Sequence, residues 1–177
     1  QGAYSLSKWY AEEGLTDLSR SSSMRVVIIR PPLVYGPGVK ANFARMVRLV
    51  RSGIPLPFGS FENLRSMVGL TNLVDFVLLC ISHPAAANQT FFVSDCRDLS
   101  TPELAKLLAN AIEKKVRLFS IPLVLLQCVA RLLGIEATLN RLSDSFVIDT
   151  SKAEQMLGWR PGTSIESELR RTVRFPS

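Results

Sequence analysis

Apolar residues in the first part of the chain recur with two different spacings, separated by polar or turn-forming residues. Over residues 3–19 the spacing is helical, whereas the run Val26–Ile29 is continuously apolar and β-branched. Such a run is typical of a strand buried on both faces of a parallel sheet. A turn rich in proline and glycine follows, after which Asn42 is predicted to cap a helix that stops at Gly53. This part of the chain therefore predicts a helix, a buried strand and a second helix.

The middle of the chain continues the alternation of strands and helices. We expect a strand near 66–70, a helix from about Asn72 and a strand in the apolar run 89–95. Ser100 followed by Glu103 has the capping-box pattern, so a helix is predicted directly after Ser100. Strands that alternate with helices in this way are typical of α/β proteins with parallel strands.

Residues 118–135 are the most apolar segment of the chain. A proline, a glutamine and an arginine interrupt this segment before the roughly 20 apolar residues of a membrane-crossing helix accumulate. We interpret it as a helix that is buried or faces a partner, so membrane contact is not expected; contact with a membrane surface is the alternative. Beyond it the pattern predicts a strand or loop, a short helix, a turn and a final helix capped by Thr163 or Ser164.

The composition fits a folded domain and limits the chemistry. Hydrophobic residues make up 47% of the 177 residues and charged residues 20%. Cys80, Cys96 and Cys128 contain no C-x-x-C pair, so we expect buried thiols in a reducing, cytoplasmic compartment and no metal site. His83 is the only histidine, which argues against a Ser-His-Asp triad, and its place before a proline predicts the C-cap of a helix.

Arginine carries most of the net charge of +6. Fifteen of the 21 basic residues are arginines, spread along the chain without a basic cluster interleaved with aromatic residues. A nucleic-acid-binding protein more often shows such a cluster, so no nucleic-acid partner is expected. Scattered guanidinium groups suit a small anionic ligand, because their forked N–H donors match phosphate.

A candidate catalytic pair lies in the first predicted helix. Tyr4 and Lys8 are four residues apart and therefore share one face of that helix. An ammonium group within about 4–6 Å favours the phenolate and lowers the pKa of a tyrosine below its usual value of about 10. Such a tyrosine can exchange a proton with a substrate hydroxyl while hydride moves to or from a nicotinamide ring. The alternative is an exposed tyrosine with a lysine one turn later.

Four motifs that follow one another along the chain support the interpretation of Tyr4 and Lys8 as a catalytic pair. They are YSLSKWYAEE from Tyr4, VVIIRPPLVYGPG from Val26, PFGSFENLRSMVGLTNLVD from Pro57 and DTSKAEQMLGWRP from Asp149. Together they resemble the extended short-chain dehydrogenase/reductases, and among these the NAD-dependent epimerase/dehydratase family. The resemblance covers nearly the whole chain. It implies an α/β fold made of the C-terminal part of a Rossmann-type parallel sheet and the small α/β substrate-binding domain.

The resemblance also implies a division of the chain. Residues 1–40 would be a remnant of the NAD(P)-binding Rossmann domain, and 41–177 would be mostly the substrate-binding region, with 66–98 returning to the Rossmann sheet. The family's glycine-rich phosphate loop is missing from the sequence, and Gly36-Pro37-Gly38 lacks its third glycine. We therefore expect the chain to be the C-terminal half of a longer enzyme and to be inactive by itself.

Site residues follow from the motifs. By resemblance, Tyr4 is the catalytic base and Lys8 its partner, both also contacting NAD or NADP. The nicotinamide pocket would be lined by four consecutive residues, Pro31, Pro32, Leu33 and Val34. For the substrate, the resemblance implies that Asn42 contacts the diphosphate or nucleotide, and the alternative is that it only caps a helix. Phe58 would contact the nucleotide base, or else pack in the core. Arg65 would bind the diphosphate, or else form a surface salt bridge. Leu33 and Asn72 stand where the family often has asparagine and aspartate, which bears on the identity of the sugar.

The implied activity is hydride transfer with NAD(P) at a sugar hydroxyl, at C4 of a nucleotide-linked hexose. The enzyme would be an epimerase, a dehydratase or a reductase, and it would act in the synthesis of surface-polysaccharide precursors. The implied partners are a nucleotide-sugar substrate and, by analogy, a second copy of the chain packed through the Tyr4–Lys8 helix. Two alternatives remain open. The protein could be a related oxidoreductase with an apolar, steroid-like substrate, which the segment 118–135 favours, or a non-catalytic binding module of the same fold.

Overall fold

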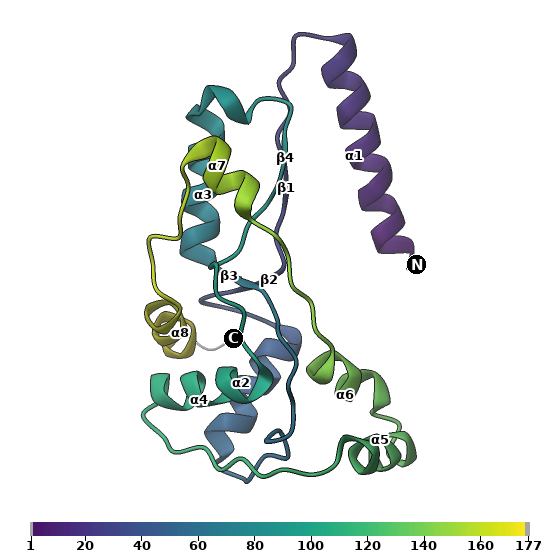
Figure 1. Cartoon of the computed structure of the whole chain (residues 1–177), viewed down its shortest axis with the longest axis vertical. Coiled ribbons are helices and arrows are strands. Elements are labelled where there is room, and N and C mark those ends of the chain that lie inside the picture. Colours follow the sequence, from purple (N-terminus) through teal and green to yellow (C-terminus); the bar gives the residue numbers. More distant parts are fainter. Residues whose placement is uncertain (1, 176–177) are drawn as a thin grey trace.

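The computed structural model describes residues 2–175, apart from the side chains of Tyr4 and Ala41 (Figure 1). Its α-helices are α1 (Ala3–Ser21), α2 (Ala41–Ser52), α3 (Leu70–Ser82), α4 (Thr101–Ala111), α5 (Leu123–Leu132), α6 (Glu136–Ser143), α7 (Ser151–Leu157) and α8 (Ile165–Arg174). Its strands are β1 (Ile28–Arg30), β2 (Leu33–Tyr35), β3 (Met67–Gly69) and β4 (Thr90–Phe92), and a 3-10 turn spans Pro84–Ala86. Helices and strands alternate through the first two thirds of the chain, which confirms the α/β class.

Both strand pairs are parallel. β1 pairs with β4, with Ile29 opposite Phe91, and β2 pairs with β3, with Val34 opposite Val68. Pro31 and Pro32 separate β1 from β2, and because proline has no backbone N–H to give to a ladder, the two strands pair with different partners. The sequence predicted a turn after the first strand, and the structure adds the short strand β2 there.

The apolar side chains form two clusters. The upper cluster in Figure 1 joins β4 to α3 and α7, where the ring of Trp159 lies edge-on to Phe76 at 5.0 Å between centroids. The lower cluster packs α2, α4 and α8 against β2 and β3. Residues 153–159, which the predicted division leaves with the substrate-binding region, therefore pack with the upper cluster.

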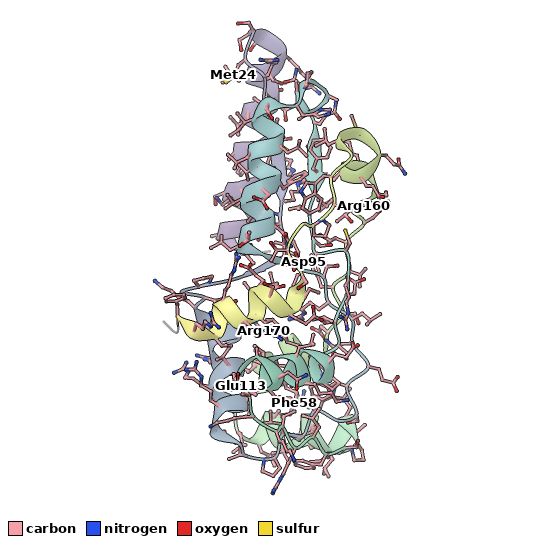
Figure 2. The ribbon with its side chains drawn as sticks, turned by 90° about the vertical axis from the view of Figure 1, so that its left-hand side faces the viewer. Met24, Phe58, Asp95, Glu113, Arg160 and Arg170 are labelled. Carbon is pink, nitrogen blue, oxygen red and sulfur yellow. The ribbon has the colours of Figure 1, made fainter. Side chains whose placement is uncertain are left out.

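A buried hydrogen-bond network joins the two clusters at Asp95, which lies between α3 and α8 (Figure 2). The hydroxyl of Tyr35 donates to its carboxylate at 2.7 Å, the backbone N–H of Gly69 donates at 3.0 Å, and the amide of Asn72 donates at 2.7 Å. The Asn72 side chain also bonds both backbone groups of Thr163, each at 2.9 Å. Burial, followed by the nearby carboxylate, raises the pKa of Tyr35 far above its ordinary value, so the hydroxyl remains a donor.

Several predicted helix ends are confirmed. Ser100 and Glu103 form the full capping box of α4, Gly53 ends α2 with a φ of 70°, and His83 is the C-cap of α3. Ser164, one of the two predicted caps, begins α8 by accepting a bond from Ser167 N–H. The prediction that Asn42 caps its helix is wrong. Lys40 is the N-cap, and Asn42 is the second residue of α2, because the helix begins as soon as the glycine-proline turn ends.

The segment 118–135 is not buried, contrary to one part of our interpretation. Of the residues in α5, only Ala130 is buried, and α6 packs against this helix as the second arm of a helical hairpin. None of the helices in residues 2–175 combines the length and hydropathy needed to cross a bilayer. The expectation of buried thiols holds for Cys80 but is wrong for Cys96 and Cys128, which are exposed.

Candidate functional site

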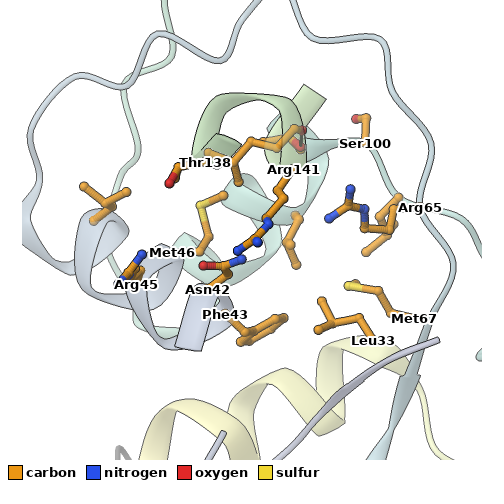
Figure 3. A pocket seen from close by; sticks show the side chains of 15 residues that line it. Leu33, Asn42, Phe43, Arg45, Met46, Arg65, Met67, Ser100, Thr138 and Arg141 are labelled. Carbon is orange, nitrogen blue, oxygen red and sulfur yellow. Dashed lines mark hydrogen bonds between the residues drawn. The ribbon is translucent and has the colours of Figure 1, made fainter. Parts of the chain in front are cut away.

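A cavity of about 130 Å³ opens between α2, the β2–β3 pair, the start of α4 and α6 (Figure 3). Side chains from all of these elements line it: Leu33, Asn42, Phe43, Arg45, Met46, Leu49, Arg65, Met67, Leu99, Ser100, Thr101, Leu104, Thr138, Arg141 and Leu142. The four walls come from segments far apart in the chain. The cavity therefore exists only when the strand pair, α2 and the α5–α6 hairpin are assembled.

The base of the cavity is apolar and fixed. Leu33 and Met67 are directly opposite each other in the β2–β3 register, and both reach the cavity together with Phe43 (Figure 3). The ring of Phe43 stacks on Tyr35 at 5.5 Å between centroids, and Tyr35 is held by the buried carboxylate at the junction of the clusters. The polar network that joins the two clusters therefore also supports the base of the cavity.

Arginines supply the polar side. Arg45, Arg65 and Arg141 line the cavity, whereas no carboxylate is among the lining side chains that the structure describes. Figure 3 shows Arg141 pointing from α6 toward Asn42, with the guanidinium of Arg65 on the other side. Guanidinium groups that line one cavity without a neutralising carboxylate create a positive potential that attracts an anion.

Arg65 is the best positioned of the three arginines. Its backbone bonds Leu99 in both directions at 3.0 Å, and its Nη2 donates to the carbonyl oxygen of Asp144 at 3.0 Å. Its Nε is buried and has no hydrogen-bond partner among the described residues. A buried donor without a partner costs about 1–3 kcal/mol.

Three of the predicted substrate or cofactor residues meet here. Leu33, Asn42 and Arg65 come from a strand, a helix and a loop, and all line the cavity. Phe58 does not: its side chain is 6% exposed and packs on Phe61 in the lower cluster at 5.6 Å between ring centroids. The structure therefore places Phe58 in the core, away from this cavity.

The other predicted residues lie near the junction of α1, β1 and β2. Pro31 and Pro32 connect the two strands, and Val34 packs against the upper cluster. Lys8 is exposed on α1, and the side chain of Tyr4 lies outside the described part of the chain. The N-terminal end of α1 lies at the height where β1 passes into β2 (Figure 1). No described residue of α1 lines the cavity.

An ion pair links α1 to strand β1. Arg30, the last residue of β1, bonds the carboxylate of Glu12 through both Nε and Nη2. This bond holds the pKa of Glu12 below its usual range. Both side chains are partly exposed, so the pair positions the helix more than it stabilises the fold.

Sequence reasoning missed Arg45, Arg141 and Thr138. Arg45 is three residues after Asn42 on the same helix, so helical spacing could have found it. Arg141 and Thr138 belong to α6, which has no buried residue and no side-chain N-cap, and which was not predicted as a helix. The sequence therefore gave no signal for that wall of the cavity.

The model of the family described as "NAD dependent epimerase/dehydratase family" matches residues 1–93. The chain is 46% identical over 172 residues to a UDP-glucose 4-epimerase of Vibrio cholerae, a match that covers 97% of this chain and 52% of that protein. It is 27% identical over 121 residues to the N-acetyl-alpha-D-glucosaminyl-diphospho-ditrans,octacis-undecaprenol 4-epimerase of Escherichia coli O157:H7, which covers 67% of this chain and 37% of that protein.

The fold is also similar to that of solved epimerase structures. The crystal structure of UDP-N-acetylglucosamine 4-epimerase from Bacillus cereus superposes with a TM-score of 0.72 at 18% identity, covering 94% of this chain and 52% of that one. The chain thus spans about half the length, or less, of the relatives described here. The family match covers more than half of the chain and includes α1, both strand pairs and α3. The chain belongs to the NAD-dependent epimerase/dehydratase family.

Proposed function

We propose that the enzyme containing this chain is a 4-epimerase that acts on a nucleotide-linked sugar by hydride transfer at the C4 hydroxyl. The observation that carries the proposal is the cavity between α2 and α6, which is lined by three arginines and by no described carboxylate. The 46% identity to a UDP-glucose 4-epimerase across nearly the whole chain supports the reaction type.

The diphosphate is the part of such a substrate that this chain recognises most directly. Arg65 and Arg141 would hold its oxygens, and the amide of Asn42 would add another donor. Leu33 and Met67 beneath them offer an apolar wall for a sugar or base. The pairing of charged rim and apolar base matches a ligand with a diphosphate at its centre.

The residues near α1 fit the nicotinamide end of NAD(P). Lys8 offers an ammonium group for ribose hydroxyls, and the segment from Pro31 to Val34 offers an apolar wall at the end of β1. When bound, the cofactor supplies hydride acceptance and return at the sugar carbon. In this proposal Tyr4 takes the proton from the C4 hydroxyl and returns it, and Lys8, one turn away, favours its phenolate.

Binding by calorimetry tests the diphosphate site without the need for turnover. UDP should bind the wild-type protein, and Arg65→Ala or Arg141→Ala should weaken binding by about tenfold or more, because each removes charge-assisted hydrogen bonds. Arg170→Ala, on the exposed face of α8 (Figure 2), is the matched control and should leave the affinity unchanged. No UDP binding, or equal losses in all three variants, would overturn the assignment of the cavity.

Turnover tests the role of the catalytic pair separately. In the longer enzyme, Tyr4→Phe should abolish nearly all epimerisation while UDP binding stays at the wild-type level. A wild-type rate in this variant would remove Tyr4 from the mechanism and leave the diphosphate site standing.

A polyprenyl-diphosphate sugar is the second candidate substrate. The E. coli relative is named for such a substrate, and in this chain the exposed apolar helix α5 packs on α6, which lines the cavity. Both candidates place a diphosphate at the same arginines. Competition between UDP and a water-soluble prenyl diphosphate distinguishes them: the compound that binds more tightly identifies the group attached to the diphosphate.

A further inference from the structure

Helix α5 presents an apolar surface that no described residue covers. We call it the α5 surface; it consists of Val124, Leu125, Val129, Leu132, Leu133 and Ile135. Leu132 is 87% exposed and Val124 70%, values unusual for side chains of this type. Val124, Leu125, Val129 and Leu132 recur at helical spacing on one side of α5, whereas Leu133 is its C-cap and Ile135 is the N-cap of α6. Helix α6 packs on α5 as the other arm of the hairpin. A contiguous apolar patch of this kind marks a site of interaction.

The charges around the α5 surface are mostly positive. From residue 113 to residue 136 the chain contains four basic residues, Lys114, Lys115, Arg117 and Arg131, and two acidic ones, Glu113 and Glu136. Arg131 forms an ion pair with Glu136 at 3.7 Å, so the remaining positive charge is on the connection from α4. The connection from α4, which carries three of these, runs along the same end of the molecule as α5 (Figure 1). A polar rim with a net positive charge complements an anionic surface.

A second exposed apolar stripe shows that this combination is specific to α5. Helix α3 exposes Val74, Leu78 and Ile81, with Ile81 at 77%. That helix contains the acidic Asp75 and no basic residue. The two surfaces are similar in exposure, but the α3 stripe has Asp75 on its own helix and Arg25 beside Ile81, so its charge is balanced, whereas the connection to α5 is net positive.

We propose that the α5 surface docks the protein onto an anionic membrane, with α5 lying in the plane of the interface. Ten residues of helix extend about 15 Å, half of the roughly 30 Å hydrocarbon core, so the helix is suited to lie in the interface and not to cross it. Apolar side chains would enter the boundary between headgroups and acyl chains, while Lys115 and Arg117 meet the headgroup phosphates.

This orientation brings the cavity close to the lipid. Thr138, Arg141 and Leu142 of α6 line the cavity, and α6 packs directly on α5. One arm of the hairpin would therefore contact lipid while the other forms a wall of the diphosphate site. That consequence rests on the proposed function, whereas the docking itself depends only on the α5 surface.

Co-sedimentation with lipid vesicles tests the docking. The protein should bind vesicles of phosphatidylcholine with phosphatidylglycerol, and bind much less to pure phosphatidylcholine. Leu132→Glu should weaken the binding by about tenfold or more, because it replaces a large apolar contact by a like-signed charge. Ile81→Glu, at an equally exposed position on α3, is the matched control and should bind as the wild type does. Circular dichroism of both variants confirms that the fold is retained, which is expected because both side chains point to solvent.

Each outcome decides the question. Loss of vesicle binding in Leu132→Glu alone supports the proposal. Absence of binding by the wild type, equal binding to both lipid mixtures, or equal losses in the two variants would overturn it. A dimer in light scattering that Leu132→Glu dissociates, without vesicle binding, would instead assign the α5 surface to a second copy of the chain. The UDP titration is independent, so failure of the docking leaves the diphosphate site unaffected.

Discussion

Replacing Asn72 by aspartate changes one amide to a carboxylate of the same shape at the junction of the two apolar clusters. The Asn72 amide nitrogen donates to Asp95 Oδ1 at 2.7 Å and to the carbonyl oxygen of Thr163 at 2.9 Å, and the side chain is 1% exposed. An ionised aspartate has no donor, so Asn72→Asp loses both bonds and sets two carboxylates face to face. Only the bond from the Thr163 N–H is kept.

The size of the effect follows from these contacts. A hydrogen bond to a charged group contributes about 1.5–3 kcal/mol, and a buried carbonyl left without a partner costs about 1–3 kcal/mol. We therefore expect Asn72→Asp to lower the free energy of unfolding by about 3–5 kcal/mol at pH 7. Because the facing carboxylate of Asp95 raises the pKa of the introduced group in the folded state, the folded protein binds more protons than the unfolded one. The loss is therefore full above the folded pKa and shrinks as the pH falls toward the unfolded value of about 3.9, where the protonated acid restores one of the two donors.

Urea unfolding at pH 7 and pH 5, followed by tryptophan fluorescence, measures this difference. Asn63→Asp is the matched control, since the Asn63 oxygen accepts from the N–H of Thr101 at 3.2 Å, at the first residue of α4. A negative charge is favourable at a helix N-terminus, so this variant should lose less than about 1 kcal/mol. Equal losses in the two variants, or a loss from Asn72→Asp that does not shrink at the lower pH, would refute the reasoning.

Three further predictions concern the same framework. Tyr35→Phe removes a 2.7 Å bond to the buried carboxylate and should cost about 1.5–3 kcal/mol in urea unfolding. Because the folded pKa of Tyr35 is raised, wild-type stability should fall as the pH rises above about 10, with a one-proton slope that the variant lacks. Gly36→Ala would place a Cβ 2.6 Å from the Cβ of Leu70 and should lower stability by about 1–3 kcal/mol, whereas Gly14→Ala, in open space on α1, should raise it by about 0.5–1 kcal/mol; thermal unfolding compares them. Phe58→Leu should cost about 1–2 kcal/mol yet leave UDP affinity in calorimetry unchanged, and a tenfold loss of affinity would restore its predicted contact with the base.

Local chemistry explains which elements the sequence predicts well. The start of α4 and the end of α2 depend on residues within one turn, Ser100 with Glu103 and Gly53, so their patterns are self-contained. Strand β2 is three residues long and follows two prolines, and it exists because β3 lies beside it. Helix α6 has no buried residue, and its packing on α5 is a tertiary contact that no local pattern encodes.

The candidate site divides in the same way. Motif order places Leu33, Asn42 and Arg65 in one family pattern, and the structure brings all three to one cavity. The motif does not tell whether the ring of Phe58 contacts a ligand or Phe61, because both environments are apolar. Arg141 joins the site from a segment 76 residues beyond Arg65, so only the assembled fold reveals it.

The charge of the cavity also bears on the choice between substrate classes. A wholly apolar, steroid-like ligand would remove water from Arg45, Arg65 and Arg141 without offering them an acceptor, at a cost that its own burial has to offset. A diphosphate makes the burial of the three arginines favourable, because its anionic oxygens accept hydrogen bonds from the guanidinium groups. The apolar base then serves the part of the ligand next to the phosphates.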